Sequence, residues 1–412
     1  MRIGDQSDAN GNRLGGAAVF SSEEFKSRLA CLASGLYDQH IDVAVITHPP
    51  DMFYFTGTCK ASYLFVPANG HAWLACRRGA ASARKETTLP VEEFTKANDL
   101  AAVFSRYLVD RPRNVGMSFE TSRIEQAARI KKLFEQAETT DITRIIMGLR
   151  QIKSAAELEY IRLAGRQLDG AFKTAASLLR LGQSELELAI RIEAYLRRKG
   201  HAGVVRTRSI GTAAIGFVAA GVSTLDPPEL DVMTYGPGLS PALPVGPGEH
   251  EFKAGEPVLF DYCGSCAGYL ADQTRMLSIG RPPDEAGWAY EAMRQILRRL
   301  ETQLKPWQET GRLYDLALRE AVQLGYEDYF MQHGKNRLSF VGHGVGLELD
   351  EPPLIARDRR ERLEPGMVFA LEPKVALPGL GVIGVENTYT ITDHGFERLT
   401  LAEETWRQIP AD

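Results

Sequence analysis

Cysteine is scarce in this chain, which has only five cysteines among 412 residues. They are Cys31, Cys59, Cys76, Cys263 and Cys266. An odd and sparse set in so long a chain argues against a framework of disulfides and for a reducing compartment. We therefore expect a cytoplasmic protein.

Long apolar runs and a strong net charge are also missing. No stretch approaches the roughly eighteen apolar residues of a membrane-spanning helix. Residues 1–18 are polar and glycine-rich and contain no apolar segment typical of a signal peptide, so we expect a flexible N-terminal arm. With 48 basic and 53 acidic residues, the net charge of −5 gives no reason to expect nucleic acid or a membrane as a partner.

Residues 19–150 show an alternation of helical and strand patterns. The stretch "SEEFKSRLACLASGLYDQH" has helical apolar spacing, and "IDVAVITH" is typical of a strand. We interpret the following "PPDM" as a turn. This alternation predicts a layered α/β domain.

Residues 151–412 have a different character, and we place the domain boundary near residue 150. A helical pattern of nearly fifty residues is interrupted once at "RLGQSE", where Ser184 and Glu185 can start a second helix. Strand patterns rich in glycine and proline follow from residue 204, divided by a helical stretch over residues 284–325.

Two aspartates lie in a predicted β-hairpin, "EPVLFDYCGSCAGYLADQTRMLSIG". Asp261 and Asp272 lie on opposite arms, so the fold-back of the chain can bring their carboxylates together. Aspartate is depleted in apolar strands because burying its charge is costly, so both residues need a partner. One alternative is a structural ion pair with Arg275.

Three further polar residues follow apolar strand-like runs. Glu372 ends "GMVFALE", Glu386 lies in "GVIGVENTYTIT", and His343 lies in "GHGVGLELDEPP". Four buried carboxylates repel one another unless cations neutralise them. Carboxylates with one imidazole suit two divalent ions such as Mn²⁺, Co²⁺, Fe²⁺ or Zn²⁺ better than a single tetrahedral zinc.

Cys263 and Cys266 enclose a Cys-Gly-Ser-Cys motif within this hairpin. In isolation such a motif indicates a redox dithiol. Its location in a strand, and not at a helix N-terminus, favours cysteines without a redox role.

In these contexts the order of the five polar residues resembles the pita-bread metallohydrolases, in the branch of creatinase, prolidase and aminopeptidase P. Over most of its length the chain is similar to this branch, from "RLACLASGLYDQHIDVAVITHPPDMFYFTGT" to "GVENTYTIT". The resemblance implies an α+β fold, with a creatinase-like N-terminal α/β domain over 19–150. A pita-bread catalytic domain over 151–412 would then have a curved antiparallel sheet backed by helices in two pseudo-symmetric halves.

The resemblance also implies a role for each of these residues. Two divalent metal ions would be held by Asp261, Asp272, His343, Glu372 and Glu386. Asp272 and Glu386 would bridge the ions, and Glu372 would also move the proton. A metal-bound water has a pKa lowered to about 7, which makes hydroxide available at neutral pH. The family further implies a homodimer.

The expected substrate-binding residues depart from the family pattern. Val245, Ser339 and Asp350 stand where peptide-cleaving members usually have histidines. An aspartate only accepts hydrogen bonds, so Asp350 would suit an amine-bearing substrate, unless it merely caps its turn. Tyr235 is a further candidate for contact with the substrate.

Two more departures lie beside the metal ligands. Lys374 replaces the glycine that commonly follows Glu-Pro in the family, and Gly384 replaces the arginine commonly found two residues before the last glutamate. We predict a metallohydrolase of the Xaa-Pro aminopeptidase or dipeptidase type that acts on short peptides or other small molecules. The alternatives are a creatinase-like hydrolase or lyase of a small nitrogenous metabolite, and a non-catalytic binding protein.

Overall fold

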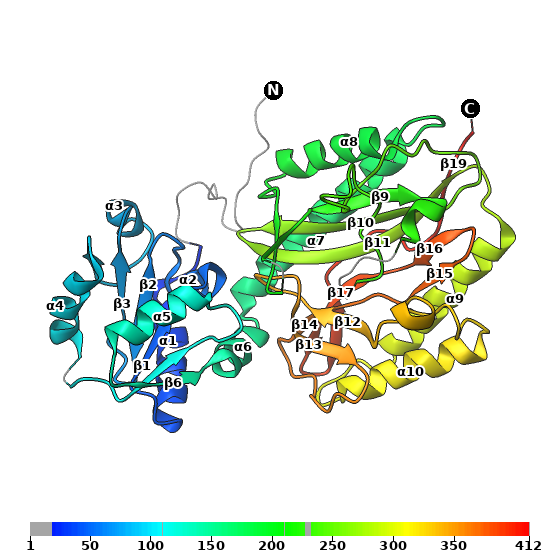
Figure 1. The fold of residues 1–412 in the computed structure, drawn as a ribbon. Helices are drawn as coiled ribbons and strands as arrows, with labels where there is room; N and C mark the ends of the chain where they lie inside the picture. The colour runs from blue at the N-terminus through cyan, green and yellow to red at the C-terminus, as the bar shows by residue number, and fades with distance from the viewer. Residues whose placement is uncertain (1–18, 109, 210, 227–231, 412) are drawn as a thin grey trace. The chain divides into compact units, whose positions relative to one another are not determined.

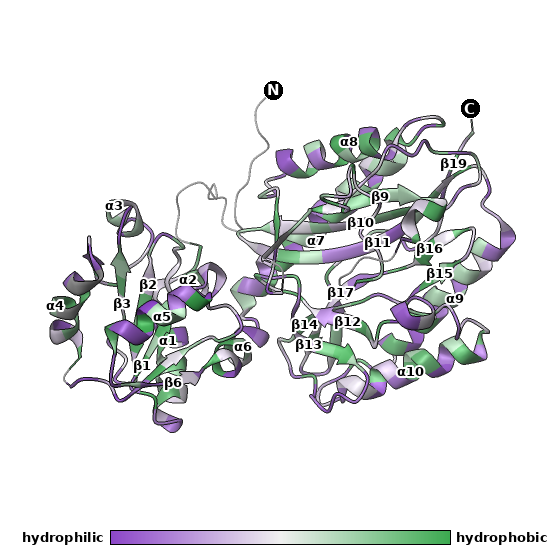
Figure 2. Cartoon of the chain, in the orientation of Figure 1, coloured by the Kyte–Doolittle hydropathy of each residue, from purple (hydrophilic) through white to green (hydrophobic). Residues whose placement is uncertain are grey.

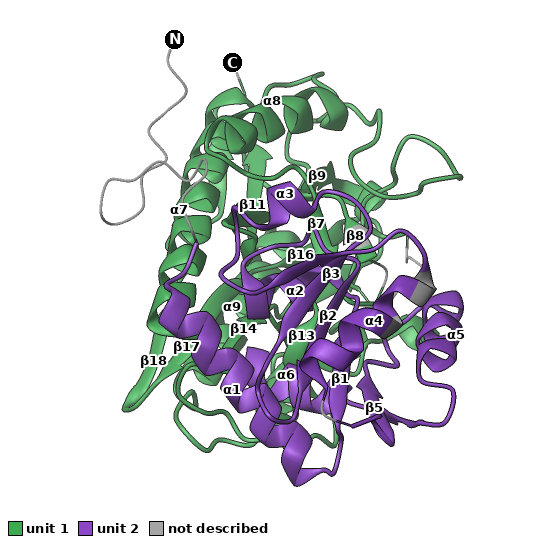
Figure 3. Cartoon of the chain, turned by 90° about the vertical axis from the view of Figure 1, so that its left-hand side faces the viewer, with its two compact units in different colours: residues 1–6, 151–412 green, residues 7–150 purple. Residues whose placement is uncertain are grey.

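The computed structural model describes residues 19–108, 110–209, 211–226 and 232–411. The chain forms two compact units that divide between Arg150 and Gln151 (Figure 1 and Figure 3). We call the described parts the N-terminal unit (19–150) and the C-terminal unit (151–411). The arm expected over residues 1–18 lies outside the described residues. Among the helices that the structure describes, none has both the length and the hydropathy that a bilayer span requires.

The N-terminal unit is a layered α/β structure, as its alternating pattern predicts. Its elements are α1 (Ser22–Asp38), β1 (Val43–Ile46), α2 (Pro49–Thr56), β2 (Tyr63–Pro67), β3 (Trp73–Cys76), α3 (Ala80–Ala83), β4 (Val91–Glu93), α4 (Ala97–Tyr107), β5 (Asn114–Met117), α5 (Ile124–Leu133), β6 (Glu138–Asp141) and α6 (Thr143–Gln151). The strands form one mixed sheet of order β4-β3-β2-β1-β5-β6. The stacked rings of Phe65 and Trp73, with centroids 4.9 Å apart, lie in its core.

The prediction of a turn at "PPDM" is wrong, because these residues begin the helix α2. Proline suits the first turn of a helix, where its missing N–H would have no intrahelical partner and its fixed φ is already helical. The helix ends at Gly57, whose positive φ of 78° closes it in the left-handed region.

The first half of the C-terminal unit consists of two helices followed by a strand region. Its elements are α7 (Ala155–Leu178), α8 (Glu185–Arg198), β7 (Val205–Thr207), β8 (Gly211–Ala213), β9 (Gly216–Ala220), η1 (Gly221–Thr224), β10 (Val258–Cys266) and β11 (Tyr269–Ile279). The side chain of Ser184 accepts a hydrogen bond from the backbone N–H of Glu187, which confirms the predicted second helix start. β10 and β11 form the predicted antiparallel hairpin, with Asp261 opposite Thr274.

The second half repeats this plan of two helices followed by antiparallel strands. Its elements are α9 (Asp284–Glu301), α10 (Thr310–Gln323), η2 (Gly334–Asn336), β12 (Phe340–Gly344), β13 (Glu351–Ala356), β14 (Val368–Leu371), β15 (Lys374–Leu377), β16 (Gly381–Gly384), β17 (Asn387–Thr392), β18 (Gly395–Arg398) and β19 (Arg407–Ile409). The main sheet of this half has the order β13-β12-β14-β17-β18, β15 pairs with β16, and β19 joins the sheet of the first half as β19-β11-β10-β9.

The helices cover the sheets through closely packed apolar faces. A Cβ atom added at Gly264 of β10 would lie 2.1 Å from the carbonyl oxygen of Ala164 in α7, so the strand needs glycine there. In Figure 2, α9 and α10 carry both hydrophilic and hydrophobic residues, and most of their apolar side chains are buried in the core of the unit, although Trp288 and Val322 are exposed. A few buried polar residues, among them Asp272, Glu372 and Glu386, are exceptions within this largely apolar sheet region.

Candidate metal centre

The hairpin of β10 and β11 places Asp261 and Asp272 on one face of the sheet. Asp261 lies opposite Thr274, and Asp272 lies opposite Cys263. Side chains alternate between the faces of a strand, so residues an even number apart, such as 272 and 274, share a face. The register of the hairpin therefore places the negative charge of half-buried Asp261 near the buried carboxylate of Asp272.

Arg275 does not pair with these aspartates, so that alternative is wrong. It lies an odd number of residues from Asp272 and therefore on the other face of β11. Its guanidinium donates to the carbonyl oxygen of Glu386 at 2.6 Å and to Oδ1 of Asn387 at 2.7 Å. Arg275 thus fixes the backbone that carries Glu386, beside the centre.

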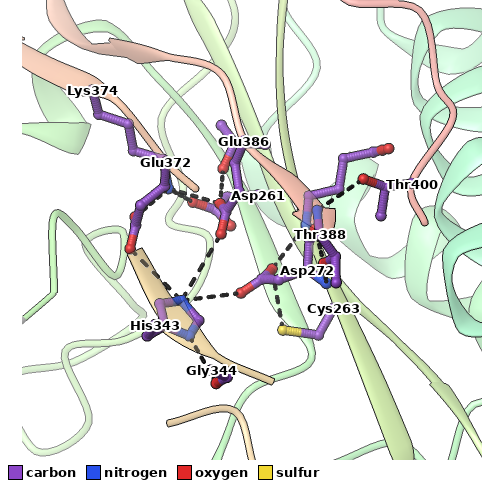
Figure 4. Close-up of polar contacts among 12 residues, drawn as sticks. Asp261, Cys263, Asp272, His343, Gly344, Glu372, Lys374, Glu386, Thr388 and Thr400 are labelled. Atoms are coloured by element: carbon purple, nitrogen blue, oxygen red, sulfur yellow. Dashed lines mark hydrogen bonds and ion pairs between the residues drawn. The ribbon is translucent and has the colours of Figure 1, made fainter. Parts of the chain in front are cut away.

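His343, Glu372 and Glu386 come from the second half of the unit. His343 lies in β12, Glu372 directly follows β14, and Glu386 directly precedes β17. The Nε2 atom of His343 lies 3.6 Å from Oε1 of Glu372 and 3.9 Å from Oε1 of Glu386 (Figure 4). It lies 4.0 Å from Oδ2 of Asp272, so both halves contribute to one cluster.

The two halves are joined by hydrogen bonds beside this cluster. The backbone N–H of Asp272 donates to Oγ1 of Thr388 at 2.8 Å, and that hydroxyl donates to the backbone carbonyl of Asp272 at 2.9 Å. The hydroxyl of Thr274 donates to Oε2 of Glu386 at 2.6 Å. These contacts hold Asp272 and Glu386 in place relative to each other.

Lys374 also belongs to this centre, although the sequence did not predict it as a member. Its Nζ atom lies 3.0 Å from Oδ2 of Asp261, 2.9 Å from Oε2 of Glu372 and 3.0 Å from Oε2 of Glu386 (Figure 4). Lys374 is 2% exposed. A lysine two residues after a predicted ligand, at the start of the apolar strand "KVAL", was the available signal.

The pKa values of the centre reflect burial and crowded charge. Burial raises the pKa of Asp272 well above its ordinary value, and the negative charges of Glu386 and Asp261 raise it further. Burial also raises the pKa of Asp261, while the Lys374 ammonium opposes part of that rise. Burial alone would lower the pKa of Lys374, but the surrounding carboxylates outweigh it and the pKa lies well above its ordinary value.

The predicted substrate residues lie in different environments. Tyr235 is half-buried, and burial followed by the nearby Cys263 and Asp350 raises its pKa to about 12. Val245 is half-buried, and Ser339 is exposed just before β12. Oδ2 of Asp350 accepts hydrogen bonds from the backbone N–H and the hydroxyl of Ser209, at 2.9 and 2.6 Å.

Cys263 and Cys266 lie three residues apart on β10 and therefore on opposite faces of the sheet. The thiol of Cys263 donates to Oδ1 of Asp272 at 3.4 Å. Burial raises the pKa of Cys266 to about 11. Two thiols on opposite faces do not form the dithiol that the motif suggests in isolation.

A carboxylate-rich centre with one imidazole, set in antiparallel strands backed by helices, defines a metallohydrolase. The model of metallopeptidase family M24 matches residues 159–393, and that of the creatinase/prolidase N-terminal domain matches residues 28–152. The chain belongs to metallopeptidase family M24. These matches confirm the predicted resemblance and the α+β fold with its pita-bread catalytic part.

The chain matches relatives with curated descriptions over nearly their whole length. The chain is 26% identical over 381 residues to an Xaa-Pro dipeptidase of Pyrococcus furiosus, covering 92% of this chain and 99% of that protein. It is 25% identical over 394 residues to an Xaa-Pro dipeptidase of Lactobacillus delbrueckii subsp. lactis, covering 92% and 98%. The solved prolidase from Pyrococcus furiosus superposes with a TM-score of 0.75 at 26% identity, over 90% of this chain and 99% of that one.

The family implies divalent metal ions, and the side chains present fit one such ion beside His343. One ligand atom each from Asp272, His343 and Glu386 lie within 4.8 Å of one another. Oε1 of Glu386 is a buried carboxylate oxygen without a hydrogen-bond partner, which is costly unless a cation neutralises it. Oxygen and imidazole donors of this kind suit borderline divalent metals.

Proposed function

We propose that this chain is a metal-dependent peptidase that hydrolyses Xaa-Pro dipeptides. The observation that carries the proposal is the convergence of ligand atoms from Asp272, His343 and Glu386, with Glu372 beside them. The likeness to Xaa-Pro dipeptidases over nearly their whole length supports this substrate class. A creatinase-like reaction and a non-catalytic role are not favoured by these relatives.

In this proposal each side chain has a definite task. Asp272, His343 and Glu386 would hold a divalent cation, and Glu372 would be a fourth ligand. A bound divalent cation lowers the pKa of a coordinated water to about 7. The carboxylate of Glu372 would take up a proton from the water and return it to the prolyl nitrogen of the leaving group.

Tyr235 and Asp350 are the proposed contacts for the substrate itself. With a pKa of about 12, the phenol of Tyr235 stays protonated at neutral pH and can donate a hydrogen bond to the peptide carbonyl. Asp350 accepts hydrogen bonds from the backbone of Arg208 and from Ser209, and a carboxylate has about four acceptor positions. A free acceptor position suits the ammonium group of a dipeptide. Val245 and Ser339 would line the remaining wall.

The test is a peptide panel assayed with the metal-loaded protein. Ala-Pro, Leu-Pro and Lys-Pro are incubated with protein loaded with Mn²⁺ or Co²⁺, and free proline is quantified. The reversed peptides Pro-Ala, Pro-Leu and Pro-Lys serve as matched controls. We expect proline release only from the first set, lost on chelation and restored by metal. Metal-loaded protein that releases no proline from any Xaa-Pro peptide would contradict the proposal.

The finer properties of the enzyme are further proposals. We propose domains at 19–150 and 151–412, supported by the division of the chain at Arg150 and Gln151. We also propose manganese, cobalt, zinc or iron as the metal, a homodimer without nucleic-acid or membrane partners, and a cytoplasmic location. The small and odd number of cysteines, five in 412 residues, supports a reducing compartment. Sedimentation of the purified protein tests the dimer.

A further inference from the structure

We infer that the ammonium group of Lys374 occupies one of two cation positions in this centre, so that each chain binds one divalent ion and not two. This inference rests on the proposed metal centre, but not on the identity of the substrate. Its basis is the set of contacts made by the lysine, the space that the fold provides for it, and the division of carboxylate oxygens between two sides of the cluster.

The contacts satisfy the lysine completely. An ammonium group has three hydrogen-bond donors, and the Nζ of Lys374 meets three carboxylate oxygens. These oxygens belong to Asp261, Glu372 and Glu386, at 3.0, 2.9 and 3.0 Å. A buried charge is tolerated when it is paired and hydrogen-bonded in this way. The lysine therefore acts as a built-in cation.

The backbone makes room for this side chain. Lys374 lies opposite Gly384 in the pairing of β15 with β16. A Cβ atom added at Gly384 would lie 2.3 Å from Cγ of Lys374, so any side chain at this position would displace the lysine from its present place. The backbone carbonyl of Lys374 accepts a hydrogen bond from the N–H of Met331 at 2.9 Å, which fixes the start of the strand. Lysine at 374 and glycine at 384 are thus matched to each other.

The oxygens of the cluster divide between two sides. On the ammonium side, Lys374 contacts Asp261 Oδ2, Glu372 Oε2 and Glu386 Oε2. On the imidazole side, His343 Nε2 faces Asp272 Oδ2, Glu372 Oε1 and Glu386 Oε1. Glu372 and Glu386 thus give one oxygen to each side. The imidazole side alone offers four ligand atoms, a full set for one small divalent ion.

A metal ion on the ammonium side would conflict with the lysine. Metal–oxygen bonds to carboxylates are about 2.0–2.2 Å long, so an ion bound to the same three oxygens would occupy the space of Nζ. A metal ion at this position would lie directly against the ammonium group of Lys374, and two positive charges in such close contact repel each other strongly. The two-ion expectation that came with the family resemblance therefore does not suit the ammonium side of this chain.

The test counts metal ions in the wild type and in Lys374→Gly. Each metal-free protein is titrated with Mn²⁺ by calorimetry, bound metal is quantified after desalting, and the Mn²⁺-loaded protein is examined by electron paramagnetic resonance. We expect one ion per wild-type chain with the spectrum of an isolated Mn²⁺. In Lys374→Gly, which removes the ammonium and opens its space, we expect two ions with an exchange-coupled spectrum.

Lys153→Met is the matched control. Lys153 is also buried in the C-terminal unit and forms an ion pair with Glu351 at 3.3 Å. This variant should keep one ion with the isolated-Mn²⁺ spectrum. Two tightly bound ions in the wild type would overturn the inference and leave the proposed function standing. No bound ion in the wild type would overturn both. If Lys374→Gly does not fold, the wild-type count still decides.

Discussion

The imidazole side and the ammonium side of the carboxylate cluster solve the same electrostatic problem in different ways. On the ammonium side, protein atoms supply the positive charge, and all three carboxylate oxygens accept hydrogen bonds from Lys374. On the imidazole side, Oε1 of Glu386 is buried with no donor, and His343 lies 3.6 to 4.0 Å from the nearest carboxylate oxygens. The first side is complete as a protein structure, whereas the second is the side for which we propose a metal ion.

The two sides of the cluster therefore differ in their expected roles: the ammonium side stabilises the fold, and the imidazole side carries the chemistry. An ammonium group on a side chain stabilises buried carboxylates, but it cannot lower the pKa of a water as a divalent ion does. Buried polar groups that lack partners are costly, and they are commonly retained at functional sites. We therefore place the reaction on the imidazole side and assign a positioning role to Lys374.

The largest expected effect comes from Glu372, which contributes one oxygen to each side. Glu372→Gln keeps the size of the side chain but removes the base and one negative charge. We expect kcat for Ala-Pro to fall by about 10²–10⁴-fold, the usual contribution of a positioned acid–base group. Steady-state kinetics with saturating Mn²⁺ measure this fall. Glu364→Gln, at an exposed glutamate, is the control and should stay within about twofold of the wild type.

Activity of Glu372→Gln within threefold of the wild type would remove the proton-transfer role from this residue. A fall in activity accompanied by loss of the ion would instead be explained by the role of Glu372 as a metal ligand. Parallel measurement of bound Mn²⁺ separates these two results.

The second prediction concerns His343, the imidazole ligand of the imidazole side. His343→Ala removes the only imidazole of the cluster, and we expect the Kd for Mn²⁺ to rise by more than about a hundredfold. This exceeds the range usually seen when a residue that only supports a ligand is changed. Calorimetric titration measures the change. His333→Ala, at an exposed histidine of the same unit, should leave the Kd unchanged. An unchanged Kd in His343→Ala would place the ion elsewhere.

Much of the fold could be predicted because its signals are local. Serine followed three residues later by glutamate marks the start of α7 and of α8, and the hairpin of Asp261 and Asp272 follows from strand period and a tight turn. The same period argues against an Arg275 partner, since residues 272 and 275 differ by an odd number. That conclusion was available from the sequence. The turn at "PPDM" was mispredicted because proline also begins helices.

The position of the Lys374 ammonium could not be predicted from local pattern. Its contacts depend on the pairing of β15 with β16, on the absence of a side chain at Gly384, and on carboxylates 113 and 12 residues away. A long flexible side chain can reach several places from one backbone position. Only the three-dimensional register decides which carboxylates it meets.

His201 is a buried histidine outside the carboxylate cluster, and the third prediction concerns its protonation. Burial, followed by the positive charge of Arg197, lowers the pKa of His201 to about 4 from an ordinary value of 6.5. Between these values the unfolded chain binds more protons than the folded protein. Stability from this residue is therefore complete above pH 6.5 and is lost as the pH falls toward 4.

We expect this loss to amount to about 2–3 kcal/mol of the free energy of unfolding. Urea unfolding at several pH values between 4 and 7 measures it, with His201→Asn for comparison. Asparagine can accept the hydrogen bond that Nδ1 of His201 accepts from the N–H of Gly203 at 2.8 Å. The variant should show a shallower pH dependence over this window. Equal slopes in both proteins would remove His201 as the cause.

The fourth prediction compares the two cysteines of β10, for which we expect only a small change in the Kd for Mn²⁺. Cys263 donates to Oδ1 of Asp272 at 3.4 Å, whereas Cys266 lies on the opposite face of the sheet. A thiol is a weak donor, so Cys263→Ala should raise the Kd for Mn²⁺ by less than about tenfold, below the usual range for a residue that supports a ligand. Cys266→Ala should leave the Kd unchanged. Calorimetric titration of both variants measures this difference, and an equal change in the two would show that the effect comes from general packing of the hairpin and not from the hydrogen bond to Asp272.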